Sequence, residues 1–240
     1  MIILPRRRRA FFGPVSWANW DEKSEDRLAS NKTAVWLEEN TIAGGNETGQ
    51  GGGLTGADLV LTDVGNMAGA TGTPPTRANV AGTGQTWPLT AQNIMFNSAT
   101  WALIFKANVT SVGIAQYWSV LGACAAGQNQ LQMAYLADNT FSCTFCQNGV
   151  SETQVSGAVV ATGIQWVAAW ATGGVMKAGI ATIRPTKLAD FSTVLTFAVN
   201  TGDMSAGSFA SNLSVWKHPG GNGILGNLYY MVASKLCLIE

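Results

Sequence analysis

Residues 130–155 read QLQMAYLADNTFSCTFCQNGVSETQV, and this stretch decides the fold of the chain. Over residues 130–135 apolar and polar side chains alternate, which is the period of a half-buried antiparallel strand. Asp138-Asn139 turns the chain into a second alternating segment, and Asn148-Gly149 is the dipeptide typical of a two-residue β-hairpin. We therefore expect three consecutive antiparallel strands here.

Short apolar alternations separated by turns recur from Thr86 to the end of the chain. Trp101, Leu103 and Phe105 share one face of an expected strand. Further strands are expected at 166–170, 175–183, 194–199, 213–216 and 225–238. No helical period stands between them, so the sequence offers no crossover helices for a parallel α/β fold. The pattern predicts an all-β fold, an antiparallel sandwich or barrel.

The chain divides into three expected parts. Residues 1–16 form a basic N-terminal arm, residues 17–85 form an irregular region that contributes strands to the sandwich, and residues 86–240 form the core. We interpret the arm either as a solvated tail or as a segment that docks on a neighbouring subunit. The arm is marked by an unbroken basic run: Arg6, Arg7, Arg8 and Arg9.

The charge balance and the hydropathy pattern restrict the classes of partner. Lysine and arginine number 14, as do aspartate and glutamate, so the 240-residue chain has a formal net charge of zero. No global field favours specific nucleic-acid binding or an anionic membrane surface. No apolar run approaches the roughly 20 residues of a membrane-spanning helix, so no membrane insertion is expected. The N-terminus is apolar first and basic second, the reverse of a signal peptide, which predicts synthesis in the host cytoplasm without one.

Four cysteines, Cys124, Cys143, Cys146 and Cys237, are too few for the disulfide framework of a small secreted domain. Cys143 and Cys146 have the spacing of zinc and redox sites, but on an extended strand their side chains point to opposite faces. The sequence therefore predicts no metal site. Buried free thiols are expected instead, which suits a reducing place of synthesis.

Four places, one of them a pair of strands, resemble in their order along the chain the concanavalin A-like lectin and glucanase superfamily in its laminin-G-like jelly-roll form. They are the tryptophan-bearing strand 98–106, the paired strands 117–122 and 131–135, the strand 164–168 and the closing strand 226–232. The resemblance implies an antiparallel jelly-roll β-sandwich over residues 86–240.

The opening ILPRRR, residues 3–8, stands ahead of Val35-Trp36-Leu37 and resembles the start of tail and other structural proteins of bacteriophages. Those proteins often carry jelly-roll domains of this kind. The resemblance implies a phage virion structural protein, a component of the tail or the capsid surface, located in the virion. Its expected partners are other virion subunits, further copies of itself as a homo-oligomer, and a glycan of the host surface.

Catalytic chemistry finds little support in the residues. Glucanases of the superfamily carry a Glu-x-Asp-x-(x)-Glu strand that holds an acid and a nucleophile, and this chain has no such strand. His218 is the sole histidine, and no Gly-x-Ser-x-Gly elbow accompanies it. We therefore expect no catalytic residues and no enzyme activity. A hydrolase would have to draw mainly on isolated aspartates: Asp58, Asp63, Asp138, Asp190 and Asp203.

Sugar binding is better supported, because lectin-like loops combine aspartate, asparagine and an aromatic ring to meet sugar hydroxyls and apolar ring faces. Loops of this composition are the candidate glycan-binding site: Asp138, Asn139, Asp190, Asp203, Trp216, His218 and Asn222. Most of the nine tryptophans are expected in the core. Calcium is common in the superfamily, but no run of Asp and Asn specifies a site, so no cofactor is predicted. The alternatives to a virion protein are a carbohydrate-binding module without a virion role and, more weakly, a glycoside hydrolase.

Overall fold

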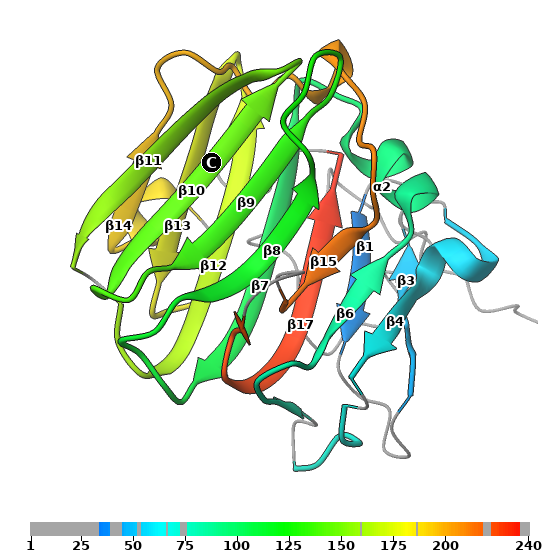
Figure 1. Ribbon diagram of the computed structural model, residues 1–240, viewed down its shortest axis with the longest axis vertical. Coiled ribbons are helices and arrows are strands. Elements are labelled where there is room, and N and C mark those ends of the chain that lie inside the picture. Colours follow the sequence, from blue (N-terminus) through cyan, green and yellow to red (C-terminus); the bar gives the residue numbers. More distant parts are fainter. Residues whose placement is uncertain are drawn as a thin grey trace, which may run out of the picture.

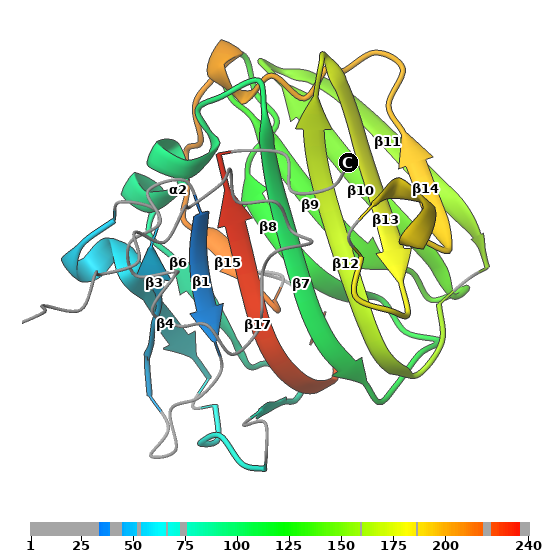
Figure 2. The same cartoon turned by 180° about the vertical axis from the view of Figure 1, so that it is seen from behind.

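The computed structural model describes residues 34–38, 45–51, 54–65, 67–72, 76–158, 160–185, 187–217 and 222–235. In these residues the chain forms two β-sheets packed face to face, an all-β antiparallel sandwich of the jelly-roll kind (Figures 1 and 2). The predicted fold class is confirmed. The basic arm lies outside the described residues.

The back sheet, nearest the viewer in Figure 2, contains eight strands among the described residues. They run in the order β14-β13-β12-β7-β17-β1-β3, and β5 pairs with β17 as well. Their bounds are β1 (Ala34–Glu38), β3 (Gln50–Gly51), β5 (Arg77–Asn79), β7 (Trp101–Val109), β12 (Gly163–Thr172), β13 (Val175–Ala181), β14 (Thr193–Thr196) and β17 (Gly226–Ser234).

The front sheet, nearest the viewer in Figure 1, contains nine strands in the described part of the chain. They run in the order β11-β10-β9-β8-β15-β6-β4-β2, and the short β16 pairs in parallel with β8. Their bounds are β2 (Glu47–Thr48), β4 (Val60–Val64), β6 (Gly84–Trp87), β8 (Gln116–Gly122), β9 (Gln130–Tyr135), β10 (Thr140–Gln147), β11 (Val150–Ala158), β15 (Leu213–Val215) and β16 (Asn222–Gly223).

The chain crosses repeatedly between the two sheets, which is the connectivity of a jelly roll. It passes from β6 in the front sheet to β7 in the back sheet, returns for β8 to β11, and crosses again for β12 to β14. It then visits the front sheet at β15 and ends in the back sheet at β17. Because β17 pairs with β1 in an antiparallel register, the two ends of the described chain are hydrogen-bonded neighbours.

The hairpin predicted at Asn148-Gly149 joins β10 and β11. Both residues have positive φ, 50° and 87°, as a turn of two left-handed residues requires. A Cβ atom at Gly149 would lie 3.0 Å from the carbonyl oxygen of Ala125, so the position favours glycine by space as well as by conformation. The register of this hairpin sets which backbone groups of β11 face outward.

The two sheets enclose one continuous apolar core. Trp101 and Phe105 of β7 face it and have no exposed surface. Their rings meet Phe145 of β10 and Trp118 of β8 across the sandwich, with centroids 6.2 Å apart in each pair. Burial of each large apolar side chain contributes roughly 1.5–3 kcal/mol. The six tryptophans with a described side chain are all buried, but they divide between two places. Trp87, Trp101, Trp118 and Trp216 lie in this core, whereas Trp166 and Trp170 belong to a second apolar cluster on the outer face of the back sheet.

One helix contradicts the expectation that no helix follows Thr86. Helix α2 (Leu89–Phe96) comes directly after β6 and packs at one end of the sandwich (Figure 1). Its eight residues make too few turns for a helical period to stand out from the neighbouring strands. Met95 and Phe96 join the core from its buried face. The other helical segments in the described residues are single 3-10 turns: η2 (Gly56–Leu59), η3 (Leu188–Asp190) and η4 (Met204–Ala206).

Candidate functional site

The polar loop residues that the sequence singles out do not meet in one place. Asp138 and Asn139 form the turn that follows β9. Asp203 precedes η4, which lies at the other end of β9, because the side-chain amide of Asn129 donates to the carbonyl oxygen of Met204 at 2.6 Å. The six residues of β9, about 20 Å of extended strand, separate the two loops. They do not form a shared site.

Each of these loop carboxylates is engaged by its own turn. Asp138 accepts hydrogen bonds from the hydroxyl (2.7 Å) and the backbone N–H (3.1 Å) of Thr140, and these bonds lower the pKa of Asp138. Asp203 accepts the same two bonds from Ser205 at 2.6 and 2.9 Å. Asp190 accepts one from the backbone N–H of Lys187 at 3.0 Å. Turn stabilisation accounts for all three carboxylates.

The expectation that Trp216 faces a sugar is wrong, because its indole is fully buried between the sheets. Its ring lies 4.8 Å from the ring of Phe105 and 5.7 Å from that of Trp118, centroid to centroid. Asn222 lies in β16, paired with β8. His218, like the four arginines of the arm, lies outside the described residues.

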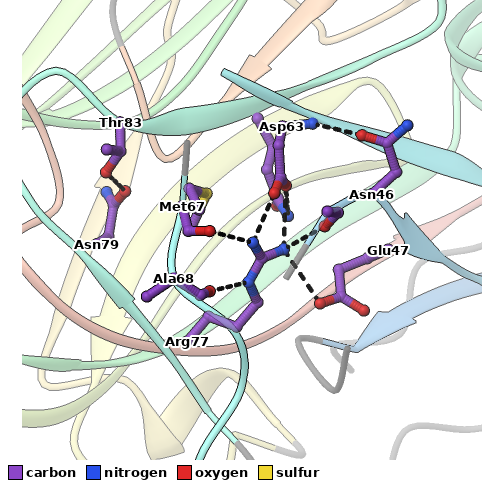
Figure 3. Close-up of polar contacts among 10 residues, drawn as sticks. Asn46, Glu47, Asp63, Met67, Ala68, Arg77, Asn79 and Thr83 are labelled. Carbon is purple, nitrogen blue, oxygen red and sulfur yellow. Dashed lines mark hydrogen bonds and ion pairs between the residues drawn. The ribbon is translucent and has the colours of Figure 1, made fainter. Parts of the chain in front are cut away.

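Arg77 gathers two carboxylates that the sequence does not connect (Figure 3). Its side chain is fully buried, as is that of Glu47, and that of Asp63 is 11% exposed. The guanidinium makes two bonds to Asp63, at 2.6 and 3.0 Å, and one to Glu47 at 3.2 Å. It also donates to three backbone carbonyl oxygens, those of Gly45, Met67 and Ala68. This Arg77 cluster ties β5 of the back sheet to β2 and β4 of the front sheet.

The Arg77 cluster fits a structural role better than a catalytic one. A retaining glycosidase needs an accessible carboxylate pair about 5–5.5 Å apart, one member protonated and the other ionised. Here both carboxylates are bound by the same buried guanidinium, so neither is placed to act on a substrate. Neither offers more than a small exposed surface. The cluster instead resembles the buried ion pairs that hold segments in a fixed arrangement.

The cysteines differ from the expectation in one respect. Cys124 and Cys146 form a disulfide that ties the β8–β9 loop to β10. The expectation that both are free thiols is therefore wrong for this pair. The sequence gives no local signal for it, because the partners are 22 residues apart. Cys143 is free and buried among the core side chains, and burial raises the pKa of its thiol. The predicted divergence of Cys143 and Cys146 to opposite faces of the strand is confirmed.

An aromatic cage on the outer face of the back sheet already has an occupant. The ammonium group of Lys106 lies 5.1, 4.6 and 5.6 Å from the ring centroids of Trp166, Tyr229 and Tyr230. Such contacts are favourable cation–π geometry. Lys106 is only 8% exposed. The aromatic cage therefore holds a lysine of the chain itself and is not open to a ligand.

The outer face of the front sheet carries a row of uncharged polar side chains that the sequence does not announce. Strand pairing places one residue from each of seven strands side by side, because each is the cross-strand partner of the next. All but Val120 carry a hydroxyl or amide group, and none is buried. Figure 1 looks onto this face. The central row consists of Thr62, Thr86, Ser214, Val120, Gln132, Thr144 and Thr153.

The flanking rows continue the uncharged character of the face. One row pairs Tyr117 with Ala134 and Ser142, and the other pairs Gln130 with Cys146. Within the central row, the hydroxyls of Thr144 and Thr153 lie 2.9 Å apart. Tyr117 therefore stands beside a row of hydrogen-bonding groups that only Val120 interrupts, and no charged side chain lies in these three rows. In the flanking rows, Ala134, Ser142 and Cys146 are buried. This combination is suited to neutral, hydroxyl-bearing ligands.

The comparisons with known proteins give the fold and no family. No protein-family model matches the chain, and no curated protein matches it significantly. A sialidase of Trypanosoma rangeli in complex with the inhibitor DANA is similar at 12% identity and a TM-score of 0.56, over 89% of this chain and 34% of that one. Another structure of this sialidase gives 12% identity and a TM-score of 0.52, over 87% and 31%. A carbohydrate-binding module, CBM40 of a Ruminococcus gnavus sialidase, gives 12% and 0.46, over 67% and 91%. At this identity the likeness to the sialidase shows a shared fold alone.

In the part of the chain that the structure describes, no three or more histidine, cysteine, aspartate or glutamate side chains gather as metal ligands would. None of the helices described is both long enough and apolar enough to cross a bilayer.

Glu152 closes the open edge between the two sheets. Its carboxylate accepts hydrogen bonds from the backbone N–H groups of Ala198, Val199 and Asn200 at 2.7–2.8 Å, and from the side-chain amide of Gln154 at 2.9 Å. Burial raises the pKa of Glu152, but these hydrogen bonds outweigh it and lower the pKa below its ordinary value. Residues 198–200 follow β14, so one side chain of β11 fastens the edge of the back sheet.

Glu152→Gln is expected to destabilise the protein by about 1–3 kcal/mol at neutral pH, since bonds to a charged acceptor are lost. A lowered pKa means that the ionised group stabilises the fold above its unfolded-state pKa, and that this stability is lost as the pH falls through the folded-state pKa. The difference between wild type and variant should therefore shrink in acid. Urea unfolding at several pH values measures it, and a difference that stays constant down to low pH would contradict this assignment.

Proposed function

We propose that the protein is a carbohydrate-binding β-sandwich that holds a neutral glycan on the outer face of its front sheet. The observation that carries the proposal is the central row, in which neighbouring strands present hydroxyl and amide groups in register. Gln132, Thr144 and Ser214 can each donate to and accept from sugar hydroxyls. Tyr117, on the same face, offers a ring on which an apolar sugar face can stack.

The absence of charge in the three rows selects the class of sugar. An anionic sugar such as a sialic acid would lose water without meeting a cation in these three rows, which costs free energy. A neutral glycan exchanges hydrogen bonds with water for hydrogen bonds with the row. The sialidases and the carbohydrate-binding module that share the fold are consistent with a glycan ligand in general, and the face itself favours a neutral one. This mode of recognition uses side chains alone and requires no cofactor.

A binding role is proposed in preference to catalysis. The carboxylate pair at Glu47 and Asp63 is bound to Arg77, and the loop aspartates are dispersed around the sandwich. The place in a bacteriophage virion stays a prediction from the sequence, since the arm that supports it lies outside the described residues. A virion protein that attaches to a host glycan could use the same face.

Removal of one hydroxyl from the central row tests the proposal. Thr144→Val preserves the shape of the side chain but leaves a sugar hydroxyl without its partner, so we expect the Kd for the bound glycan to rise roughly tenfold. Gln132→Ala should have a similar effect. The matched control is Thr196→Val, the same change at an exposed position of the back sheet, which should leave the Kd unchanged.

The ligand itself is found by screening the folded full-length chain against an array of neutral and sialylated glycans, followed by calorimetry. We expect binding to neutral glycans only. Silence of the whole array, or equal Kd values for wild type and Thr144→Val, would remove the proposal. Binding restricted to sialylated glycans would move the site away from this face.

A further inference from the structure

Among the described residues, strand β11 is a long sheet edge that no further strand covers. It spans nine residues and pairs there with β10 alone, and it forms the left border of the front sheet in Figure 1. The strands that end the other sheet borders in the described residues are short, with four residues in β14 and two in each of β2 and β3. Soluble proteins usually protect long edges with lysine, proline or a covering segment. The sequence of β11, VSETQVSGA, contains no lysine, arginine or proline.

The register of the hairpin determines which backbone groups of this edge are open. In a two-residue hairpin, Gln147 and Val150 form the first hydrogen-bonded pair, and bonding alternates along the strand from there. Ser151, Thr153 and Val155 therefore point their N–H and C=O groups away from β10. Within the described residues these groups have no backbone partner. Their side chains lie exposed on the outer face.

The edge is also held in place. Glu152, the one charged residue of β11, uses its carboxylate on residues 198–200, so it neither repels a second strand nor is available to one. At the far end, a register shift opposite Thr140 and Ser142 ends the regular ladder after Val155. The open edge is thus a fixed template of about six residues, from 150 to 155.

We propose that two copies of the chain pair through β11, antiparallel, about a two-fold axis at Thr153. In this register Ser151 of one copy faces Val155 of the other, and the two Thr153 residues face each other. Each facing pair exchanges both of its backbone hydrogen bonds, because all three residues have outward N–H and C=O groups. Two copies of the same edge can thus satisfy each other's backbone hydrogen bonds, whereas an unrelated strand would have to match the length and register of β11.

The pairing has a structural consequence for the central row. Thr153 is the last residue of that row, so the row of one copy continues directly into the row of the second copy across the junction. The second copy thereby extends the polar face. The pairing itself does not depend on a glycan, and it is independent of the proposed function.

The test uses the full-length chain without ligand. We expect sedimentation velocity to show a concentration-dependent monomer–dimer equilibrium. Thr153→Pro should raise the dimer Kd at least about tenfold, because proline lacks the outward N–H. The change is compatible with folding, since that N–H does not belong to the β10 ladder. Val155→Lys, which places a charge at the edge, should have the same effect even if the proline variant misfolds.

The matched control is Thr86→Lys in β6, which adds a charge on the same face but five strands away from the β11 edge. It should leave the dimer Kd unchanged. Hydrogen exchange provides a second readout. The amides of Ser151, Thr153 and Val155 should become protected as the concentration rises, while those of Glu152 and Gln154 are protected throughout. A monomer at all concentrations overturns the proposal, and so does an oligomer that survives both Thr153→Pro and Val155→Lys.

Discussion

Replacement of Arg77 by methionine is expected to lower the free energy of unfolding by about 3–5 kcal/mol. Methionine fills a similar volume but leaves two carboxylates without their cation, and that of Glu47 is fully buried. The three backbone carbonyls that Arg77 bonds would lose their donors as well. Equilibrium unfolding in urea, with circular dichroism as the probe, measures the change.

Two further variants separate charge from packing. Lys187→Met removes a positive charge at an exposed position and should change stability by no more than about 0.5 kcal/mol. The triple variant Arg77→Met/Glu47→Gln/Asp63→Asn removes the stranded charges and should recover part of the lost stability. Equal stability of the single and triple variants would show that burial of charge is not the cause.

Trp216→Ala is expected to cost about 3–5 kcal/mol of stability, because it removes a large side chain from the centre of the sandwich. The indole packs against Phe105 and Trp118, which cannot close the resulting cavity without moving two strands. Thermal and urea unfolding measure the effect.

The neighbouring residue is the control for this position. Lys217 is partly exposed, and its side chain makes one bond to an exposed backbone carbonyl, so Lys217→Ala should be nearly neutral. A residue of a sugar-binding loop would behave in the opposite way to Trp216, with glycan binding lost and stability kept. That pattern for Trp216→Ala would restore the original sequence-based interpretation of this residue.

The parts of the fold that were predicted from the sequence are those whose signals are local. The alternation over 130–135 and the Asn148-Gly149 turn lie within a few residues of the structure they specify, and both are confirmed. Helix α2 was missed because eight residues carry too little of a helical period. Trp216 was misplaced because it directly follows a short strand, and only the fold shows that its side chain turns inward.

The candidate site could not be predicted from local sequence patterns, because its residues are far apart in the sequence. Arg77 lies 14 residues from Asp63 and 30 from Glu47, so no spacing rule connects the three. The central row draws neighbouring residues from strands that are far apart in sequence, such as Ser214 and Val120. Its continuity depends on the register of every strand pair, which the whole fold determines. The alignment of these polar side chains is a tertiary property.

The geometry of the front sheet also determines the spacing at which a polymer bound across it meets successive side chains. Strands in a sheet are about 4.8 Å apart, so a chain lying along the central row meets a new side chain at that interval. Each strand is also rotated by about 20–25° from the last. A rigid rod would therefore leave the surface after a few strands, whereas a polymer that coils gently could follow the twist along its full width. The shape of the sheet thus discriminates between ligands by their stiffness, before any individual side chain is involved.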